Sequence, residues 1–512
     1  MKPKLPGVLI TGASGFIGRN LVESLQEDYR IFALARRTQQ EVGIQRHQNM
    51  EWMLVDLADE EQVNRAVRDI QAKGGIQFVI HLAGYYDFSY EDHPEYERTN
   101  VIGTRNLLKS SIILKPQRFI FASSLVVSDF PKEGEVITEK SPPDADFPYA
   151  RSKREGERLC KEHSTHFPVS VVRFAAIFSD WCEYGPLYMF LKAWLSKSWN
   201  NRILAGKGES AVTYLHVHCL VKILEQILVK HKYLPRFDIY LASPDRAISH
   251  RKLFHLSTRF YFGEPRKPIY LPLWIVVPGM YLRDWFGQIT GHRPFERPWM
   301  ARYIDRQLQV DASYTRTVLD WHPVTRCFLI RRLIFMMERL KSAPGEWQLR
   351  NEAAMKRTGD RPNLLIAETL LKRQDAIINQ ILDELTSPER ARYYSNYQKL
   401  DREKLLWYVT IACNLLMTAV RTGDRLAMSN YARFIAGIRI REGFPFREIA
   451  SGFRVMGDVV FTTLSQEPLF KDKEHLLRDN VGLTIQLAID EIEDAYEQAA
   501  PSPGELARDT EH

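Results

Sequence analysis

The first 180 or so residues alternate between short apolar runs and segments whose apolar residues recur at helical spacing. Segments 59–73 and 100–111 show the helical spacing. Strands that alternate with helices predict βαβ units, and hence a parallel sheet with helices on both faces. The runs that we interpret as buried strands are residues 8–11, 30–35, 51–57, 78–84, 118–124 and 169–178.

The pattern changes beyond about residue 180. Residues 180–340 are less regular and richer in aromatic residues and proline, as expected of a substrate-binding subdomain. Residues 342–362 are polar and charged, which indicates a linker. From residue 363 the spacing is helical and strand signals nearly vanish, which predicts a separate all-α domain over 363–500 and a flexible tail over 501–512.

The composition is that of a folded protein, with 45% hydrophobic and 26% charged residues. A net charge of +7 is mild for 512 residues, and no basic stripe with interleaved aromatic residues stands out, so we expect no nucleic-acid partner. The five cysteines lack the spacing of a metal site. We therefore expect reduced thiols, no metal and a cytoplasmic location.

Two longer apolar runs bear on membrane association. The apolar run at residues 270–282 is too short for a spanning helix and is interrupted by Pro272 and Pro278. Residues 405–420 fall short of the roughly 20 residues of a spanning helix and include Asn414. We interpret both as buried helices and expect no membrane span. Peripheral contact with a membrane through 270–282 stays open.

The segment TGASGFIG joins the first predicted strand to the first helix. Its three glycines have separate uses: one permits the tight turn, one lets the backbone approach a pyrophosphate, and one lets helix and strand pack closely. The N–H groups at the start of the helix would face the phosphates. We therefore predict a dinucleotide site, with contacts from Gly12, Ser14, Gly15, Phe16, Ile17 and Gly18.

The end of the second strand bears on which dinucleotide is bound. A carboxylate there binds the ribose 2′-hydroxyl of NAD, whereas this chain has Arg36, Arg37 and no acid. Two cations suit the 2′-phosphate of NADP, so NADP is the preferred cofactor and NAD the alternative. Either arginine could instead simply face solvent. Asp56 ends the third strand, where it could bind the adenine amino group or cap a helix.

The motifs TGASGFIG, VDL, HLAG, NVIGT, FASS and YARSK occur in an order and spacing that resemble the extended short-chain dehydrogenase/reductase family, also called NAD-dependent epimerase/dehydratase. The resemblance covers about residues 5–340. It implies that Tyr149 is the general acid/base, Lys153 its partner and Ser124 the hydroxyl that polarises the substrate oxygen, with Ser123 as the alternative. It also implies further cofactor contacts from Leu57, Leu82, Ala83, Gly84, Asn100, Tyr149 and Lys153.

Elementary electrostatics agrees with this assignment for the tyrosine and the lysine. Four residues apart on a helix, Tyr149 and Lys153 share one face. A tyrosine pKa near 10 must fall by about 3 units for the phenol to act as a base near pH 7, which takes roughly 4 kcal/mol. One ammonium about 4 Å away supplies about that much at an effective dielectric near 20.

These observations define the predicted architecture. The fold class is α/β: a Rossmann-type, doubly wound parallel sheet with a small substrate subdomain, followed by a separate all-α domain. The α/β domain spans residues 1–341, with its Rossmann core at about 5–180.

The chain departs from the family where nucleotide-sugar enzymes grip their substrate. Those relatives commonly carry an asparagine after the sixth strand and an arginine before an HV landmark. The matching positions here are Ala175, Ala176 and Val212. The sequence thus looks more like the branch that acts on sterols, flavonoids and other carbonyl or alcohol compounds. The aromatic run at 85–90 could line the pocket or pack as an ordinary loop.

The predicted function is an NAD(P)-dependent oxidoreductase that acts on a small carbonyl or alcohol substrate. One alternative is an NAD-dependent sugar epimerase or dehydratase that retains its cofactor. Another is a sensor of NADP redox state that signals through the helical domain, because residues 431–464 weakly resemble helical input domains of bacterial stress-signalling and PucR-type regulators. A homodimer and a protein partner for the helical domain stay open.

Overall fold

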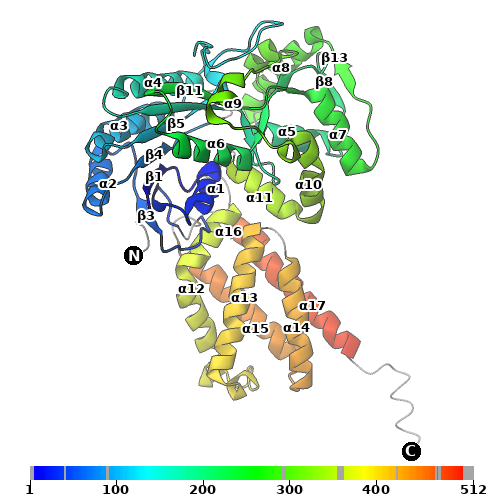
Figure 1. Ribbon diagram of the computed structural model, residues 1–512. Helices are drawn as coiled ribbons and strands as arrows, with labels where there is room; N and C mark the ends of the chain where they lie inside the picture. Colours follow the sequence, from blue (N-terminus) through cyan, green and yellow to red (C-terminus); the bar gives the residue numbers. More distant parts are fainter. Residues whose placement is uncertain are drawn as a thin grey trace, which may run out of the picture. The chain divides into compact units, whose positions relative to one another are not determined.

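The computed structural model describes residues 5–39, 42–87, 92–290, 296–354, 362–422, 425–467, 470 and 474–499. The chain divides into two compact units, one made of residues 1–342 and 350–356, the other of 343–349 and 357–512. The first unit is α/β and the second is helical, as the sequence pattern predicts (Figure 1).

A seven-stranded parallel sheet is the centre of the first unit, in the order β11-β6-β5-β4-β1-β2-β3. Six strands match the predicted apolar runs. The seventh, β11, was missed because its segment FDIYLA lies in the region interpreted as an irregular subdomain. The strands are β1 Gly7–Thr11, β2 Arg30–Ala35, β3 Met50–Leu54, β4 Phe78–His81, β5 Arg118–Ser124, β6 Val169–Phe174 and β11 Phe237–Ala242.

Helices cover both faces of this sheet, because alternate strand residues are buried in two separate cores. Val8 and Ile10 pack with α1, α6 and α9, whereas Leu9 packs with α2, α3 and α4. The helices on the first face are α1 Phe16–Leu25, α6 Val217–Lys230 and α9 Ser313–Leu319. Those on the second face are α2 Glu60–Ala72, α3 Gly103–Leu114 and α4 Pro148–His163. Strands β1 and β4 are neighbours at the point where the strand order reverses, which is where this type of sheet binds ligands.

The subdomain of the first unit consists of three two-stranded sheets and short helices. The strand pairs are β7 Ala176–Phe178 with β10 Tyr214–His216, β9 Ala211–Val212 with β12 Ile248–Ser249, and β8 Ile203–Ala205 with β13 Ile269–Leu271. The helices are α5 Gly185–Trp194, α7 His250–Phe262, α8 Leu273–Thr290, the 3₁₀ helix η3 Pro298–Tyr303, and α10 Leu329–Ser342.

The second unit has its own apolar core, in which α12 packs against α13 and α15, and α14 packs against α17. Within the described residues, α13 is long and apolar enough to cross a membrane, a test that core helices of soluble bundles also pass. The helices are α12 Pro362–Thr386, α13 Arg402–Thr422, α14 Leu426–Arg441, α15 Phe446–Ser465, α16 Glu474–Leu477 and α17 Leu483–Ala499.

The segment predicted as a linker contains a helix, α11 Pro344–Ala354. Its Asn351 side chain is fully buried, accepts a hydrogen bond from the Glu183 N–H at 2.8 Å and donates one to the Trp181 carbonyl at 2.8 Å. Part of the linker segment is therefore anchored on the subdomain. Residues 355–361 and the predicted tail at 501–512 lie outside the described residues.

Candidate active site

The glycine turn lies where β1 meets α1. Gly12 has φ +69°, and a Cβ there would lie 2.7 Å from the backbone nitrogen of Ala83. A Cβ on Gly18 would lie 2.2 Å from the carbonyl oxygen of Gly12. Gly15 is the N-cap of α1 and contributes no side-chain cap, so the N–H groups of the first helical turn are left for another acceptor. This cradle, which only glycine permits, fits a pyrophosphate.

The other predicted residues of the turn have packing roles. Phe16 and Ile17 are partly buried and pack on the core beneath the sheet. The carbonyl oxygen of Ser14 accepts a hydrogen bond from Arg37 Nη2 at 2.8 Å. Arg37 is thus held beside the glycine turn.

Arg36 and Asp56 belong to one charged cluster at the ends of β2 and β3. Arg36 Nη1 lies 3.3 Å from a carboxylate oxygen of Glu95. Arg98 Nη1 lies 3.0 Å from the other oxygen, and Arg98 also pairs with Asp56. The N-cap of α2 is Asp59, whose carboxylate accepts two backbone N–H groups. The helix-cap alternative for Asp56 is therefore wrong.

His81 ends β4 and is fully buried. Its Nδ1 lies 2.7 Å from Thr11 Oγ1 and its Nε2 lies 2.9 Å from Thr104 Oγ1. Burial, with a smaller contribution from the charge of Lys153, lowers the pKa of His81 to about 3. The ring is thus a neutral, packed element of the sheet.

Asn100 connects the loop after β4 to the helix of the YARSK motif. It lies in a π-helix, η1 Tyr96–Ile102, which leads into α3. Its Oδ1 accepts the Tyr85 N–H at 2.6 Å, and its Nδ2 donates to the Tyr85 carbonyl at 2.9 Å and to Ser152 Oγ at 2.9 Å. A π-turn at this point is of the kind often found at functional sites.

Tyr149 and Lys153 share one face of the first turns of α4. The helix begins at Pro148, whose fixed φ suits the first helical position. The Tyr149 ring is partly buried, with its centroid 4.4 Å from that of Tyr86. Lys153 Nζ lies 6.0 Å from the centroid of the Tyr149 ring. The predicted pair is therefore close in space as well as in sequence.

Lys153 is a buried cation whose ammonium is hydrogen-bonded to the strand β5. Its side chain is 5% exposed, and Nζ donates a hydrogen bond to the Ala122 carbonyl at 2.8 Å. A Cβ on Gly84 would lie 3.1 Å from Nζ, so the glycine leaves room for the ammonium. Burial lowers the pKa of Lys153 to about 8. The ammonium is thus mostly protonated at pH 7.

The two serines at the end of β5 differ in environment. Ser123 is 2% exposed, and its hydroxyl donates to Glu157 Oε1 at 2.6 Å. Arg173 binds both oxygens of that carboxylate, at 3.0 and 2.9 Å. Ser124 is partly exposed and points to the opposite face of the strand. The hydroxyl of Ser123 is thus bound to the carboxylate of the buried ion pair, whereas the hydroxyl of Ser124 lies on the more open side of the strand.

The ion pair of Glu157 and Arg173 was missed by sequence reasoning. A signal existed, because Glu157 follows Lys153 by four residues and so lies on the same face of α4. Leu57 proves to be buried and packs where a Cβ on Gly103 would lie, 3.0 Å from Leu57 Cβ.

The structure brings the predicted residues together in three groups. The glycine turn meets the end of β4 through Gly12 and Ala83, with Leu82 partly buried beside them. Lys153 and Asn100 meet at Gly84, where a Cβ would lie 3.1 and 3.5 Å from their side-chain atoms. Arg36 and Asp56, joined through Glu95 and Arg98, form the third group at the ends of β2 and β3. Among the described residues, no group of three His, Cys, Asp or Glu side chains could hold a metal ion.

Comparison with known proteins finds one family. Residues 8–242 match the model of the NAD dependent epimerase/dehydratase family. A putative dihydroflavonol 4-reductase from Synechocystis sp. is 30% identical over 131 residues, 25% of this chain and 36% of that protein. UDP-glucose 4-epimerase from Vibrio cholerae is 22% identical over 339 residues, 62% of this chain and 92% of that protein. The chain thus spans about a third of the length of the reductase.

A solved structure shares the fold of the first unit. The dTDP-glucose 4,6-dehydratase of Bacillus anthracis, in complex with NAD, has a TM-score of 0.51 and 19% identity. The likeness covers 67% of this chain and 99% of that one.

Proposed function

Because residues 8–242 match the model of the NAD dependent epimerase/dehydratase family, we propose that the first unit is an oxidoreductase that interconverts an alcohol and a carbonyl group. When bound, a nicotinamide dinucleotide would supply the acceptor or donor of hydride. The observation that carries the proposal is the Tyr149–Lys153 pair on α4, with the Lys153 ammonium buried and hydrogen-bonded to the Ala122 carbonyl at 2.8 Å.

Tyr149 would exchange the proton of the reacting oxygen. In the oxidation direction its phenolate accepts the proton of the substrate alcohol, and in the reverse direction its phenol returns that proton to the carbonyl oxygen. Lys153, with a pKa of about 8, is protonated at pH 7 and stabilises the phenolate. The Ser124 hydroxyl would donate a hydrogen bond to the same substrate oxygen and orient it.

The substrate we propose is a carbonyl or alcohol compound other than a nucleotide sugar. A sugar nucleotide carries a diphosphate, which needs cationic or amide donors near the end of β6 and the start of β10. Ala175, Ala176 and Val212 supply no such side chains. The backbone N–H groups of Ala175 and Ala176 are also already used, bonding the carbonyls of Ala242 and Thr213 at 3.1 Å each.

Substitution of Tyr149 tests the reaction. We expect Tyr149→Phe to lower NADPH-dependent reduction of a panel of aldehydes and ketones by about 10²–10⁴-fold, because the proton donor is lost. The rise in melting temperature caused by NADPH should stay, since the glycine turn is intact. Unchanged turnover in the variant would overturn the assignment of Tyr149, and a wild-type protein that no dinucleotide stabilises would overturn the cofactor site.

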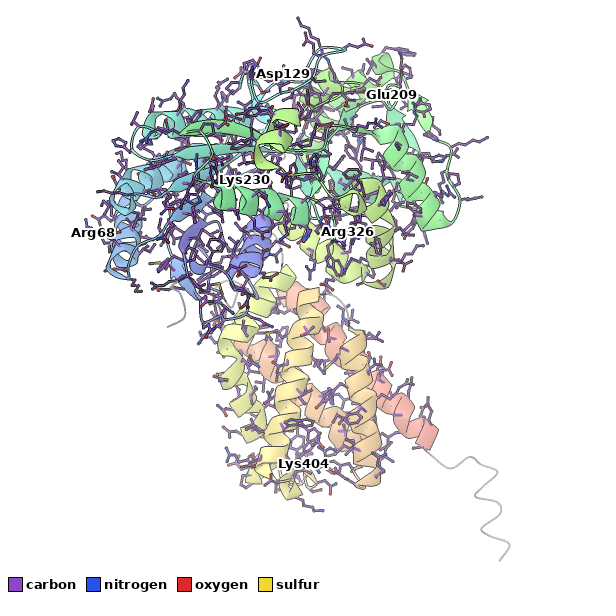
Figure 2. All side chains as sticks on the ribbon, in the orientation of Figure 1. Arg68, Asp129, Glu209, Lys230, Arg326 and Lys404 are labelled. Atoms are coloured by element: carbon purple, nitrogen blue, oxygen red, sulfur yellow. The ribbon has the colours of Figure 1, made fainter. Side chains whose placement is uncertain are left out.

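We also propose that NADP is preferred over NAD, on the basis of Arg36 and Arg37. We expect Arg36→Ala/Arg37→Ala to weaken NADP binding by about 10–100-fold and NAD binding much less, because charge-assisted bonds to the 2′-phosphate are lost. Titration calorimetry with both dinucleotides measures the ratio. Arg68→Ala is the matched control, since Arg68 is an exposed arginine on α2 (Figure 2). Equal losses for both dinucleotides would contradict the preference.

A second candidate is an epimerase or dehydratase that retains its cofactor. It is favoured by the likeness to UDP-glucose 4-epimerase. In that case substrate would be isomerised or dehydrated without net consumption of added NADPH. Following cofactor absorbance and product together during turnover separates the two functions.

A further inference from the structure

Helix α8 and the strand before it expose an unusual number of large apolar side chains. A surface helix ordinarily turns polar residues to solvent. Between residues 273 and 286 only Arg283 and Asp284 are charged. Trp274 is 76% exposed. The exposed large apolar residues of this region, which we call the α8 patch, are Ile269, Tyr270, Leu273, Trp274, Ile275, Tyr281, Leu282, Trp285 and Phe286.

The patch is a coherent face of the helix. At 100° per residue, six of its members fall within an arc of about 140°. The opposite side holds the partly or fully buried residues Val277, Met280, Asp284 and Gly287. Asp284 is fixed there by an ion pair with Arg297 at 2.7 Å. The helix is therefore attached by its narrower side and presents its wide apolar side outward.

The surface around the patch is basic. Lys267 precedes β13 and is exposed. Arg283 is exposed on α8 at the border of the apolar arc, where its partner Glu296 lies 3.7 Å away. Trp199 is 87% exposed and lies just before β8, the strand that pairs with β13. Apolar side chains with tryptophan, flanked by cations, match the interface of an anionic bilayer.

We propose that the α8 patch docks the protein on a membrane surface rich in anionic lipid. A second copy of the chain fits less well. A symmetric contact through this patch would bring Lys267 and Arg283 of both copies close together, and like charges would repel. An anionic lipid surface neutralises the same cations.

Contacts through η3 connect α8 to the segment that follows β5. Helix α8 packs against η3, and the ring of Tyr303 in η3 lies 4.7 Å from that of Phe130. Phe130 follows β5 and Ser124 by only six residues. Figures 1 and 2 share one orientation, and both α8 and Asp129 lie at the top of the first unit. A docked molecule would thus hold the substrate side of the site near the lipid.

Vesicle co-sedimentation of the full chain tests the proposal. We expect the wild type to pellet with vesicles of phosphatidylcholine and phosphatidylglycerol, less with phosphatidylcholine alone, and less in high salt. Trp274→Glu/Leu282→Glu should lower the partition coefficient by at least about tenfold, because two apolar side chains no longer enter the lipid. The matched control is Val229→Glu/Tyr233→Glu, which changes two exposed apolar residues elsewhere on the first unit. It should pellet like the wild type.

Two outcomes would overturn the proposal. One is a wild type that stays in the supernatant with anionic vesicles, or a patch variant that pellets as well as the wild type. The other is a dimer, seen by light scattering without lipid, that the patch variant dissociates while vesicles capture nothing. Quenching of wild-type tryptophan fluorescence by brominated lipid gives a second readout if the patch variant misfolds. NADPH-induced stabilisation is measured in parallel, so failure of the cofactor site is distinguished from failure of docking.

Discussion

At the scale of single residues, the positive charge of Lys153 destabilises the folded state, yet the proposed reaction needs that charge. An ammonium that is 5% exposed loses most of its hydration on folding. Burial accordingly lowers its pKa from 10.5 to about 8. The folded state thus disfavours the charge that the proposed chemistry needs, and the hydrogen bond to the Ala122 carbonyl offsets only part of that cost.

We therefore expect Lys153→Met to abolish turnover yet raise the unfolding free energy of the first unit at pH 7 by about 2–3 kcal/mol. At pH 7 the lysine is protonated in both states, so folding buries a charge. That cost shrinks as the pH rises through about 8 and vanishes above 10.5, where the lysine is neutral in both states. Denaturant titrations of both proteins, at neutral pH and above the unfolded pKa, measure the difference. A gain that did not shrink with pH would have another cause.

Sequence reasoning could place a serine, a tyrosine and a lysine at the site but could not choose between the serines by itself. Ser123 and Ser124 both end an apolar run, and only the direction of each side chain separates them. The two side chains point to opposite faces of β5 by strand alternation, but which hydroxyl is already bound depends on Glu157 and Arg173, which come from α4 and β6. The sequence places Glu157 on the same helix face as Lys153, whereas its pairing with Arg173 and its hydrogen bond from Ser123 appear only in three dimensions.

At the scale of elements, the strands β1, β2, β4, β5 and β6 were predictable because they are almost entirely buried, whereas β3 was predicted although it is only partly buried. Asp238 interrupts the apolar segment FDIYLA of β11, and the first three residues of this strand are only partly buried. It is an edge strand of the sheet, so its apolar signal is weaker. The prediction for helix α8 was wrong in the opposite direction. Its apolar run predicts a buried helix, whereas the structure exposes most of its large apolar side chains.

The packing of α1 on the glycine turn gives a paired prediction. Gly18→Ala should destabilise the first unit by about 1–3 kcal/mol or more and weaken dinucleotide binding, because the new Cβ would lie 2.2 Å from the Gly12 carbonyl oxygen. Gly437→Ala is the control, at a position in α14 where a Cβ meets nothing within 4 Å. It should stabilise the second unit by about 0.5–1 kcal/mol. Thermal melts followed by circular dichroism report both changes, and a neutral Gly18→Ala would show that the turn tolerates a side chain.

At the scale of the whole molecule, the two units have separate apolar cores. We expect calorimetry to resolve two unfolding transitions, with NADPH raising only that of the first unit. Ligand at 100 times its Kd contributes about 2.7 kcal/mol to the state that binds it. The fragment 363–499, studied alone, should reproduce the transition that NADPH leaves unchanged. A single transition that moves as a whole on adding NADPH would instead mean that the units unfold together.

The helical region after residue 363 could be recognised from the sequence as a separate domain, because the change from alternating strands and helices to helices alone is abrupt. Its role was not, since a helical core of leucine, isoleucine and alanine serves many purposes with the same pattern. The segment before it shows the limit of composition. Residues 342–362 are polar enough for a linker, yet Asn351 is fully buried, because its amide satisfies backbone groups of the subdomain.

The anchoring of Lys153 on β5 has a geometric consequence. The carbonyl that holds its ammonium belongs to Ala122, two residues before Ser124 on the same strand. The positions of Ser124 and of the Lys153 ammonium are thus both set by β5, although Lys153 belongs to α4. A small displacement of β5 would move Ser124 and the carbonyl that binds the Lys153 ammonium together, so the distance between the hydroxyl that orients the substrate and the charge near Tyr149 would change little.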